Sequence, residues 1–166
     1  MLSTEQATAR EGNATELVAQ ALEAGWRHID ASLIYRNQNG TGIALKTSGI
    51  PRKEVSTSRP TWIRGSDSHV SFNFLLQLYI TSKYDAINNR SVTEEIQTTL
   101  DQLQVEYLDL YLIHFPRAAV NGGGIRQVWK EMELVKAKGL ARSIGISNYD
   151  TEDLLKEVLD VAEVLP

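Results

Sequence analysis

The sequence predicts an α/β fold with a buried parallel sheet. Short apolar runs alternate with longer amphipathic stretches along the chain. Two of these stretches begin with capping-box patterns, which mark the start of a helix. Strands that alternate with helices of roughly 10 to 15 residues form βαβ units and a parallel sheet. A chain of 166 residues fits one domain, which we expect over residues 1–166.

The N-terminal part predicts two helices around one strand. Asn13-Ala-Thr-Glu16 offers a capping box, and apolar residues then recur at helical spacing until Gly25. A strand is expected over residues 27–31 and a second helix over residues 37–46. Residues 49–52, Gly-Ile-Pro-Arg, then turn the chain. The apolar face of the first helix consists of Leu17, Val18, Ala21 and Leu22.

The C-terminal part repeats the strand and helix alternation. Strands are expected over residues 80–84, 108–113 and 141–146. A second capping box, Ser91 to Glu94, opens one helix, Gly139 ends the next, and Asp150 is expected to cap the last. The apolar stripes of these helices are Val92, Ile96, Leu100 and Leu103; Ile125, Val128, Trp129, Met132 and Val135; and Leu154, Leu155, Val158 and Leu159.

Composition argues against several classes of function. The net charge of −4 and the absence of a Lys/Arg run give no basic surface for nucleic acid or for an anionic membrane. No apolar run approaches the roughly 20 residues that span a bilayer, and the N-terminus has no apolar leader segment. The absence of cysteine agrees with a cytoplasmic protein, and the three histidines lack the spacing of metal ligands, so no metal is predicted.

Four segments carry a more specific pattern: Gly25 to Tyr35, Ile80 to Tyr84, Tyr107 to Pro116 and Gly139 to Tyr149. In residue type, order and spacing they resemble the signatures of the aldo-keto reductase family. The resemblance covers most of residues 13–164. Alternating strands and helices leave a barrel and a doubly wound sheet open, and the resemblance implies the (β/α)₈ TIM barrel. Reactive side chains of such barrels lie at the C-terminal ends of the strands.

The resemblance implies a catalytic tetrad of Asp30, Tyr35, Lys83 and His114. Hydride delivery to a carbonyl carbon develops negative charge on the oxygen, which requires a nearby proton donor. Tyr35 is the expected acid, and an ammonium such as Lys83 favours the phenolate and so lowers the phenol pKa. Asp30 would keep Lys83 charged, and His114 would orient the carbonyl. Each residue alone has an ordinary structural interpretation, but the complete set in family order favours catalysis.

The resemblance also implies a nicotinamide cofactor, NADPH, and a small carbonyl substrate, an aldehyde or ketone that is reduced to an alcohol. Ser147 and Asn148 resemble the pair that hydrogen-bonds the nicotinamide carboxamide, and Asp30 is included among the cofactor-binding residues. The alternative for Ser147 and Asn148 is an ordinary turn at the end of a strand.

Two departures from the family pattern affect the prediction. The chain supplies about four βα units, or half a barrel, and we expect no counterpart of the family's first strand or of the three units that would follow Pro166. About two dozen residues, 56–79, also intervene where the family would continue directly. They are either translated non-coding sequence or a surface insertion. Arg59 within them is a weaker rival of Lys83, because a guanidinium cannot be neutralised.

Three functions are compatible with these observations. The first is an NADPH-dependent oxidoreductase. The second is a non-catalytic protein that binds a partner on the same fold, since fold does not determine function. The third is an inactive, truncated product. The tetrad favours the first, and the expected missing strands favour the third.

Overall fold

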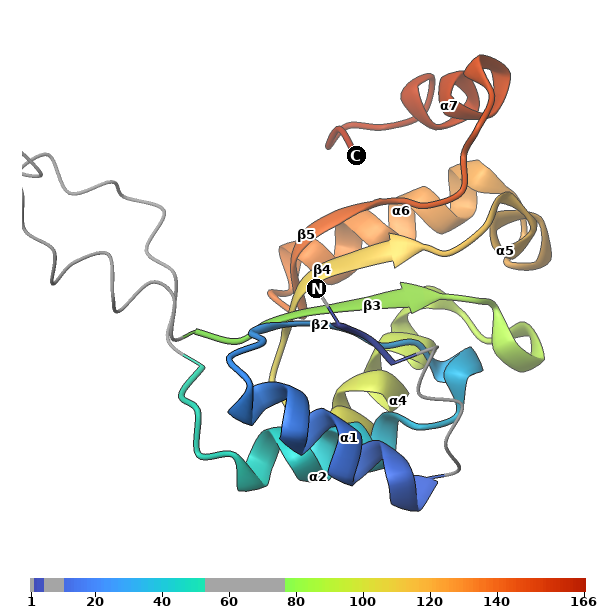
Figure 1. The fold of residues 1–166 in the computed structure, drawn as a ribbon. Coiled ribbons are helices and arrows are strands. Elements are labelled where there is room, and N and C mark those ends of the chain that lie inside the picture. The colour runs from blue at the N-terminus through green and yellow to red at the C-terminus, as the bar shows by residue number, and fades with distance from the viewer. Residues whose placement is uncertain (1, 5–10, 53–76) are drawn as a thin grey trace, which may run out of the picture.

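The computed structural model describes residues 2–4, 11–52 and 77–166 (Figure 1). Its strands form one five-stranded sheet, and every neighbouring pair is parallel. The strands are β1 (Leu2–Ser3), β2 (His28–Asp30), β3 (Tyr79–Tyr84), β4 (Leu108–Ile113) and β5 (Ala141–Ile146). Their order in the sheet equals their order in the chain. A doubly wound sheet reverses its strand order at a switch point, so the observed order is that of a barrel wall.

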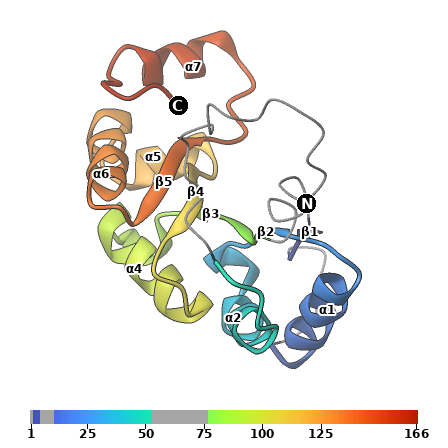
Figure 2. The same cartoon turned by 90° about the vertical axis from the view of Figure 1, so that its left-hand side faces the viewer.

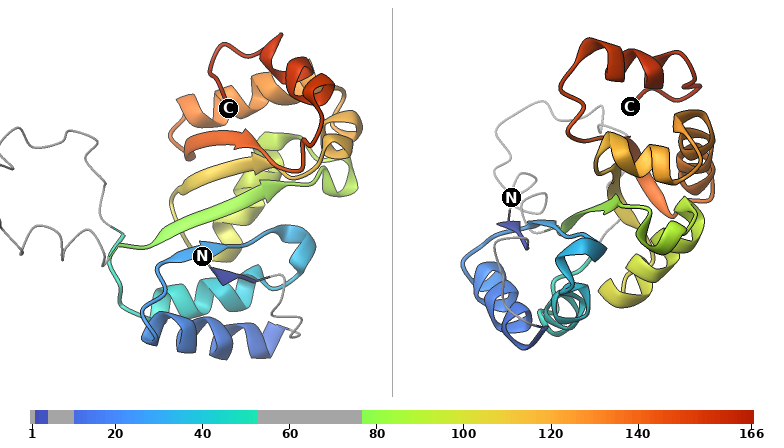
Figure 3. Two further views of the ribbon diagram at one scale, coloured as in Figure 1. Left: turned by 45° about the horizontal axis from the view of Figure 1, so that its top comes forward. Right: turned by 90° about the vertical axis from the view of Figure 1, so that its right-hand side faces the viewer.

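The helices cover one side of this curved sheet. They are α1 (Glu11–Glu23), α2 (Gln38–Thr47), α4 (Val92–Leu103), α5 (Pro116–Asn121), α6 (Ile125–Ala137) and α7 (Glu152–Leu159), with 3₁₀ turns η1 (Leu33–Tyr35) and η2 (Ile87–Asn89). Viewed along the strands, α1, α2, α4 and α6 follow one another around the outside of the sheet (Figure 2), and the two further views agree (Figure 3). The described residues therefore form part of a (β/α) barrel.

Packing follows the apolar stripes of the sequence in α4 and α6, whereas Leu17 of α1 and Leu155 and Leu159 of α7, expected on apolar faces, are exposed. The capping box at Ser91 and Glu94 is present at the start of α4, and all four apolar positions of that helix are buried. In α6, the stripe from Val128 to Val135 is buried, and the Trp129 indole donates a hydrogen bond to the Val164 carbonyl oxygen at 3.2 Å. These contacts confirm the sequence prediction for both helices.

Helices α2 and α4 approach each other closely at Gly42. A Cβ at this position would lie 2.2 Å from the Gln102 carbonyl oxygen, so only glycine fits.

Among the described helices none is both long and apolar enough to cross a membrane.

Several element boundaries differ from the prediction. Leu2 and Ser3 pair with Ile29 and Asp30, so a short first strand exists and the sheet has five strands, not about four. That strand was missed because two residues are too short for a periodic signal. Helix α1 begins at Glu11, which places Asn13 inside the helix rather than at its cap. A capping-box pattern is a local signal, and the helix continues through it.

Two further boundaries also shift. Strand β3 begins at Tyr79, and Leu78 is only 5% exposed in the core. Within the expected insertion, Tyr79 is therefore part of the sheet and Leu78 is part of the core, whereas Arg59 and the rest of residues 53–76 lie outside the described residues. Helix α7 begins at Glu152, so Thr151 and not Asp150 directly precedes it.

Candidate active site

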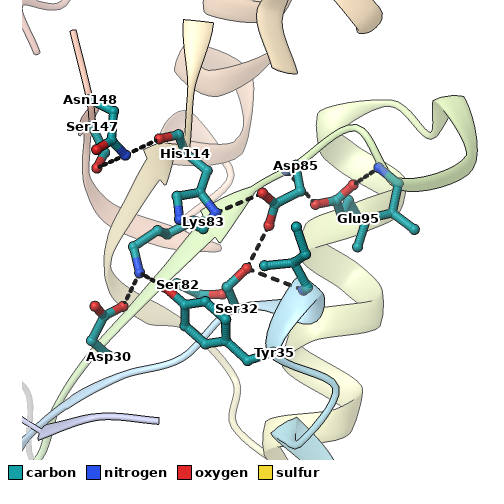
Figure 4. A network of polar contacts seen from close by, with 12 residues as sticks. Asp30, Ser32, Tyr35, Ser82, Lys83, Asp85, Glu95, His114, Ser147 and Asn148 are labelled. Carbon is teal, nitrogen blue, oxygen red and sulfur yellow. Dashed lines mark hydrogen bonds and ion pairs between the residues drawn. The ribbon is translucent and has the colours of Figure 1, made fainter. Parts of the chain in front are cut away.

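The C-terminal ends of four neighbouring strands place the predicted site residues together (Figure 4). Asp30 ends β2, Lys83 lies near the end of β3, and His114 and Ser147 directly follow β4 and β5. The sheet's hydrogen bonding continues through these exits, because the His114 amide donates to the Tyr84 carbonyl oxygen at 3.0 Å and the Ser147 amide to that of Ile113 at 2.9 Å. The strand ends are therefore fixed by backbone contacts on the same edge of the sheet.

Tyr35 reaches this edge from the turn that follows β2. Ser32 precedes η1 in an extended conformation, and its hydroxyl oxygen accepts a hydrogen bond from the Ile34 amide at 3.4 Å. Arg36 then adopts a left-handed conformation with φ of 56°, which ends the turn after one helical step. The result is that the Tyr35 phenol faces the end of β3.

Lys83 connects two members of the predicted tetrad. Its Nζ donates to Asp30 Oδ1 at 2.5 Å and to the Tyr35 hydroxyl oxygen at 2.7 Å. Asp30 and Lys83 are 7% and 6% exposed. Burial by itself lowers the pKa of Lys83, but the hydrogen bonds to Asp30 and Tyr35 and the nearby charge outweigh burial, and the net pKa is raised. The geometry thus holds a charged ammonium against a phenol oxygen.

His114 completes the cluster from the other side. Its ring meets the Tyr35 ring edge to face at 5.9 Å, and it stacks on Phe115 at 4.1 Å between ring centres. Nδ1 lies 2.6 Å from Asp85 Oδ1. Because Asp85 occupies Nδ1, Nε2 is the ring nitrogen that remains for a ligand. All four predicted tetrad residues are therefore brought together.

Asp85 and Glu95 belong to this network and were missed by the sequence interpretation. The Asp85 side chain is 4% exposed and follows β3 directly. The Glu95 carboxylate accepts hydrogen bonds from the amides of Asp85 at 2.7 Å and Ile87 at 2.8 Å. Burial raises the pKa of Glu95 to about 7, although these amide contacts partly oppose the shift. A carboxylate at a barrel strand's C-terminal end is the sequence signal that could have identified Asp85.

Ser147 and Asn148 lie beside His114 and offer one hydrogen-bond donor and one acceptor to a ligand. Asn148 Nδ2 donates to the His114 carbonyl oxygen at 2.8 Å and to Ser147 Oγ at 3.1 Å. These bonds use the amide nitrogen, so Asn148 Oδ1 remains as an acceptor and the Ser147 hydroxyl as a donor. Asn148 has a φ of 60°, an uncommon conformation often found at functional sites. One acceptor beside one donor fits a carboxamide group.

In the part of the chain that the structure describes, no cluster of three His, Cys, Asp or Glu could hold a metal ion.

Comparison with known proteins gives the relationship of the whole chain. The sequence profile described as "Aldo/keto reductase family" matches residues 1–163. The chain is 33% identical over 153 residues to glyoxal reductase of Bacillus subtilis (strain 168), and this match covers 92% of the chain and 46% of that protein. Methylglyoxal reductase DkgA of Yersinia pestis gives the same identity and the same coverage.

Solved structures agree with the sequence matches. The crystal structure of an aldo/keto reductase from Brucella melitensis superposes with a TM-score of 0.70 at 28% sequence identity and covers 94% of the chain and 51% of that structure. The chain thus spans about half the length of the curated relatives that it matches. The profile match, the relatives and the shared barrel wall lead to one conclusion: the chain belongs to the aldo/keto reductase family.

Proposed function

We propose that this chain carries the catalytic half of an NADPH-dependent oxidoreductase that reduces small aldehydes or ketones to alcohols. The main support for this proposal is that Lys83 Nζ contacts both Asp30, at 2.5 Å, and the Tyr35 hydroxyl, at 2.7 Å. A phenol held against a charged ammonium is suited to proton transfer near neutral pH. The relatives named glyoxal reductase and methylglyoxal reductase support a small aldehyde as the substrate.

In the proposed mechanism, a nicotinamide cofactor, when bound, would provide the hydride for the carbonyl carbon. Tyr35 donates its proton to the carbonyl oxygen as negative charge develops there. Lys83 lies 2.7 Å from the phenol oxygen and stabilises the phenolate that remains. Asp30 keeps Lys83 charged. His114, when protonated on both nitrogens with Asp85 as the counter-charge, donates from Nε2 to the carbonyl oxygen and orients it.

The residues that would hold the nicotinamide end are Ser147 and Asn148. The free acceptor Oδ1 of Asn148 would receive the carboxamide N–H, and the Ser147 hydroxyl would donate to the carboxamide oxygen. Such contacts would fix which face of the nicotinamide ring meets the carbonyl. Asp30 is also proposed as a cofactor-binding residue, since Lys83 Nζ holds its carboxylate close to the Tyr35 hydroxyl.

The test uses a completed barrel. Residues 1–163 of the chain, without residues 56–77, are joined to the C-terminal half of the Bacillus subtilis glyoxal reductase, and NADPH consumption is followed with a small aromatic aldehyde. We expect turnover, and we expect Tyr35→Phe to lower kcat by on the order of 10²-fold or more, the scale of general acid catalysis. Tyr107→Phe is the matched control, because this ring stacks between Arg52 and Arg142 away from the site. Normal turnover of Tyr35→Phe would exclude Tyr35 as the acid.

A further inference from the structure

Asp85 binds two loops of the candidate site with its two carboxylate oxygens. Oδ1 lies 2.6 Å from His114 Nδ1, and Oδ2 accepts a hydrogen bond from the Ser32 hydroxyl at 2.5 Å (Figure 4). The Asp85 side chain is 4% exposed, and Ser32 is fully buried. Ser32 begins the turn that carries Tyr35 three residues later. One carboxylate therefore connects the turn of the proposed acid with the histidine that faces it.

The backbone beneath Asp85 is itself held in place. Its amide donates to Glu95 Oε1 at 2.7 Å, and Glu95 Oε2 accepts from the Ile87 amide at 2.8 Å. Glu95 is anchored on helix α4, so the position of Asp85 is set by a rigid element as well as by β3. This support matters because a side chain positions its neighbours only when its own backbone is fixed.

The contact at Nδ1 also determines where the histidine proton lies. An ionised carboxylate can only accept hydrogen bonds, so the His114 nitrogen facing it carries hydrogen. Nε2 then faces the substrate as an acceptor when the ring is neutral, and as a donor to a carbonyl oxygen when the ring is protonated on both nitrogens. In the second state, Asp85 supplies the balancing charge. Without Asp85, the His114 ring would keep its contacts with Phe115 and Tyr35 but would lose the hydrogen bond that fixes the Nδ1 proton.

We propose that Asp85 is a positioning residue that fixes the His114 ring with its proton on Nδ1 and ties it to the Tyr35 turn through Ser32. This proposal rests on the proposed reductase function for its kinetic consequence, but its structural part can be measured without any activity.

The first measurement is ¹⁵N NMR of the histidine rings in the 166-residue chain, in solution or, if the chain associates, in the solid state. Loss of one ring signal in His114→Gln assigns the residue. At a pH where the ring is neutral, we expect the proton of His114 on Nδ1. In Asp85→Ala we expect a mixture that includes the Nε2-protonated form. Asp109→Ala is the matched control, since Asp109 is an equally buried carboxylate that contacts Arg52 and the Ile80 amide instead, and it should leave the His114 signals unchanged.

Two NMR results would contradict the proposed role of Asp85. A wild-type ring with its neutral proton on Nε2 overturns the proposal, and this result does not depend on whether a variant folds. Unchanged His114 signals in folded Asp85→Ala overturn it as well.

The kinetic measurement uses the completed barrel described above. There, Asp85→Ala should lower kcat by up to about 10²-fold, the cost of misplacing a reacting group by about 1 Å, while KM changes little. An active wild type with an Asp85→Ala variant of equal kcat contradicts the positioning role and leaves the reductase function standing. An inactive wild type whose His114 proton lies on Nδ1 contradicts the reductase function alone.

Discussion

Replacing Lys83 with methionine tests the central ion pair most directly. Methionine has a similar length but no charge, so the buried Asp30 carboxylate would lose its charged partner. Removal of one partner from a buried pair costs about 3 to 5 kcal/mol, because an uncompensated charge stays inside the protein. We therefore expect the free energy of unfolding of Lys83→Met to fall by about that amount, a large part of the roughly 5 to 15 kcal/mol typical of domains.

The double variant Asp30→Asn/Lys83→Met separates charge from packing. It removes both charges, so no buried ion is left unpaired, and we expect its stability to lie within about 1 to 2 kcal/mol of the wild type. The raised pKa of Lys83 means that its stabilising contribution is fully present below its unfolded pKa, near 10.5, and is lost only as pH rises through the higher folded value. Measurements at neutral pH therefore record the whole effect.

Urea unfolding, followed by the fluorescence of buried Trp129, measures these differences. In the completed barrel, both variants should also lose about 10²-fold or more in kcat, because neither places an ammonium against the Tyr35 oxygen. Recovery of stability without recovery of activity is the expected result. A Lys83→Met variant as stable as the wild type, or a double variant no more stable than the single one, would refute the buried pair as the structure shows it.

Two further predictions concern pH and cofactor. Because the folded pKa of Glu95 is raised from 4.5 to about 7, protonated Glu95 stabilises the fold at low pH and the stabilisation is lost as pH rises through that value. The free energy of unfolding should therefore fall by about 2 to 3 kcal/mol more in wild type than in Glu95→Gln between about pH 5 and about pH 8, and equal pH dependence would contradict this assignment. For the 166-residue chain alone, we expect that micromolar NADPH does not saturate binding in a tryptophan fluorescence titration, with light scattering to record the mass of the protein. The reason is that Ser147 and Asn148 offer contacts to the carboxamide but no charge-assisted contact to phosphate. Micromolar binding by a monodisperse monomer would disprove it.

Sequence reasoning succeeded where periodicity and end signals agreed. Strands β4 and β5 have the predicted bounds, and the capping box at Ser91 starts α4 as expected. It failed where the signal was short or ambiguous. The two-residue strand β1 forms because Leu2 and Ser3 pair with β2, a non-local interaction that no periodicity predicts. The apparent cap at Asn13 was overruled by a helix that begins at Glu11.

In the candidate site, too, some features could be predicted from the sequence and others could not. The proximity of the four residues proposed as a tetrad was predictable because their motifs resemble the family's in order, although the sequence could not give the 2.5 and 2.7 Å contacts of Lys83. Asp85 was not predictable in the same way. Its partners Ser32 and His114 lie 53 and 29 positions away in the chain, so the connection exists only in the folded sheet.

The side-chain contacts at the strand ends concern the proposed proton transfer more than the affinity for the proposed cofactor. Asp30 and Lys83 lie on β2 and β3 and His114 directly follows β4, and each is held by a partner within the described residues. The geometry of the proposed proton transfer therefore depends on local contacts along one sheet edge. For the proposed cofactor, Ser147 and Asn148 offer contacts to the carboxamide end alone, so we expect tight binding to need further contacts beyond these strands. Changes at Tyr35 or Lys83 should accordingly affect kcat, whereas completing the barrel should chiefly affect the affinity for NADPH.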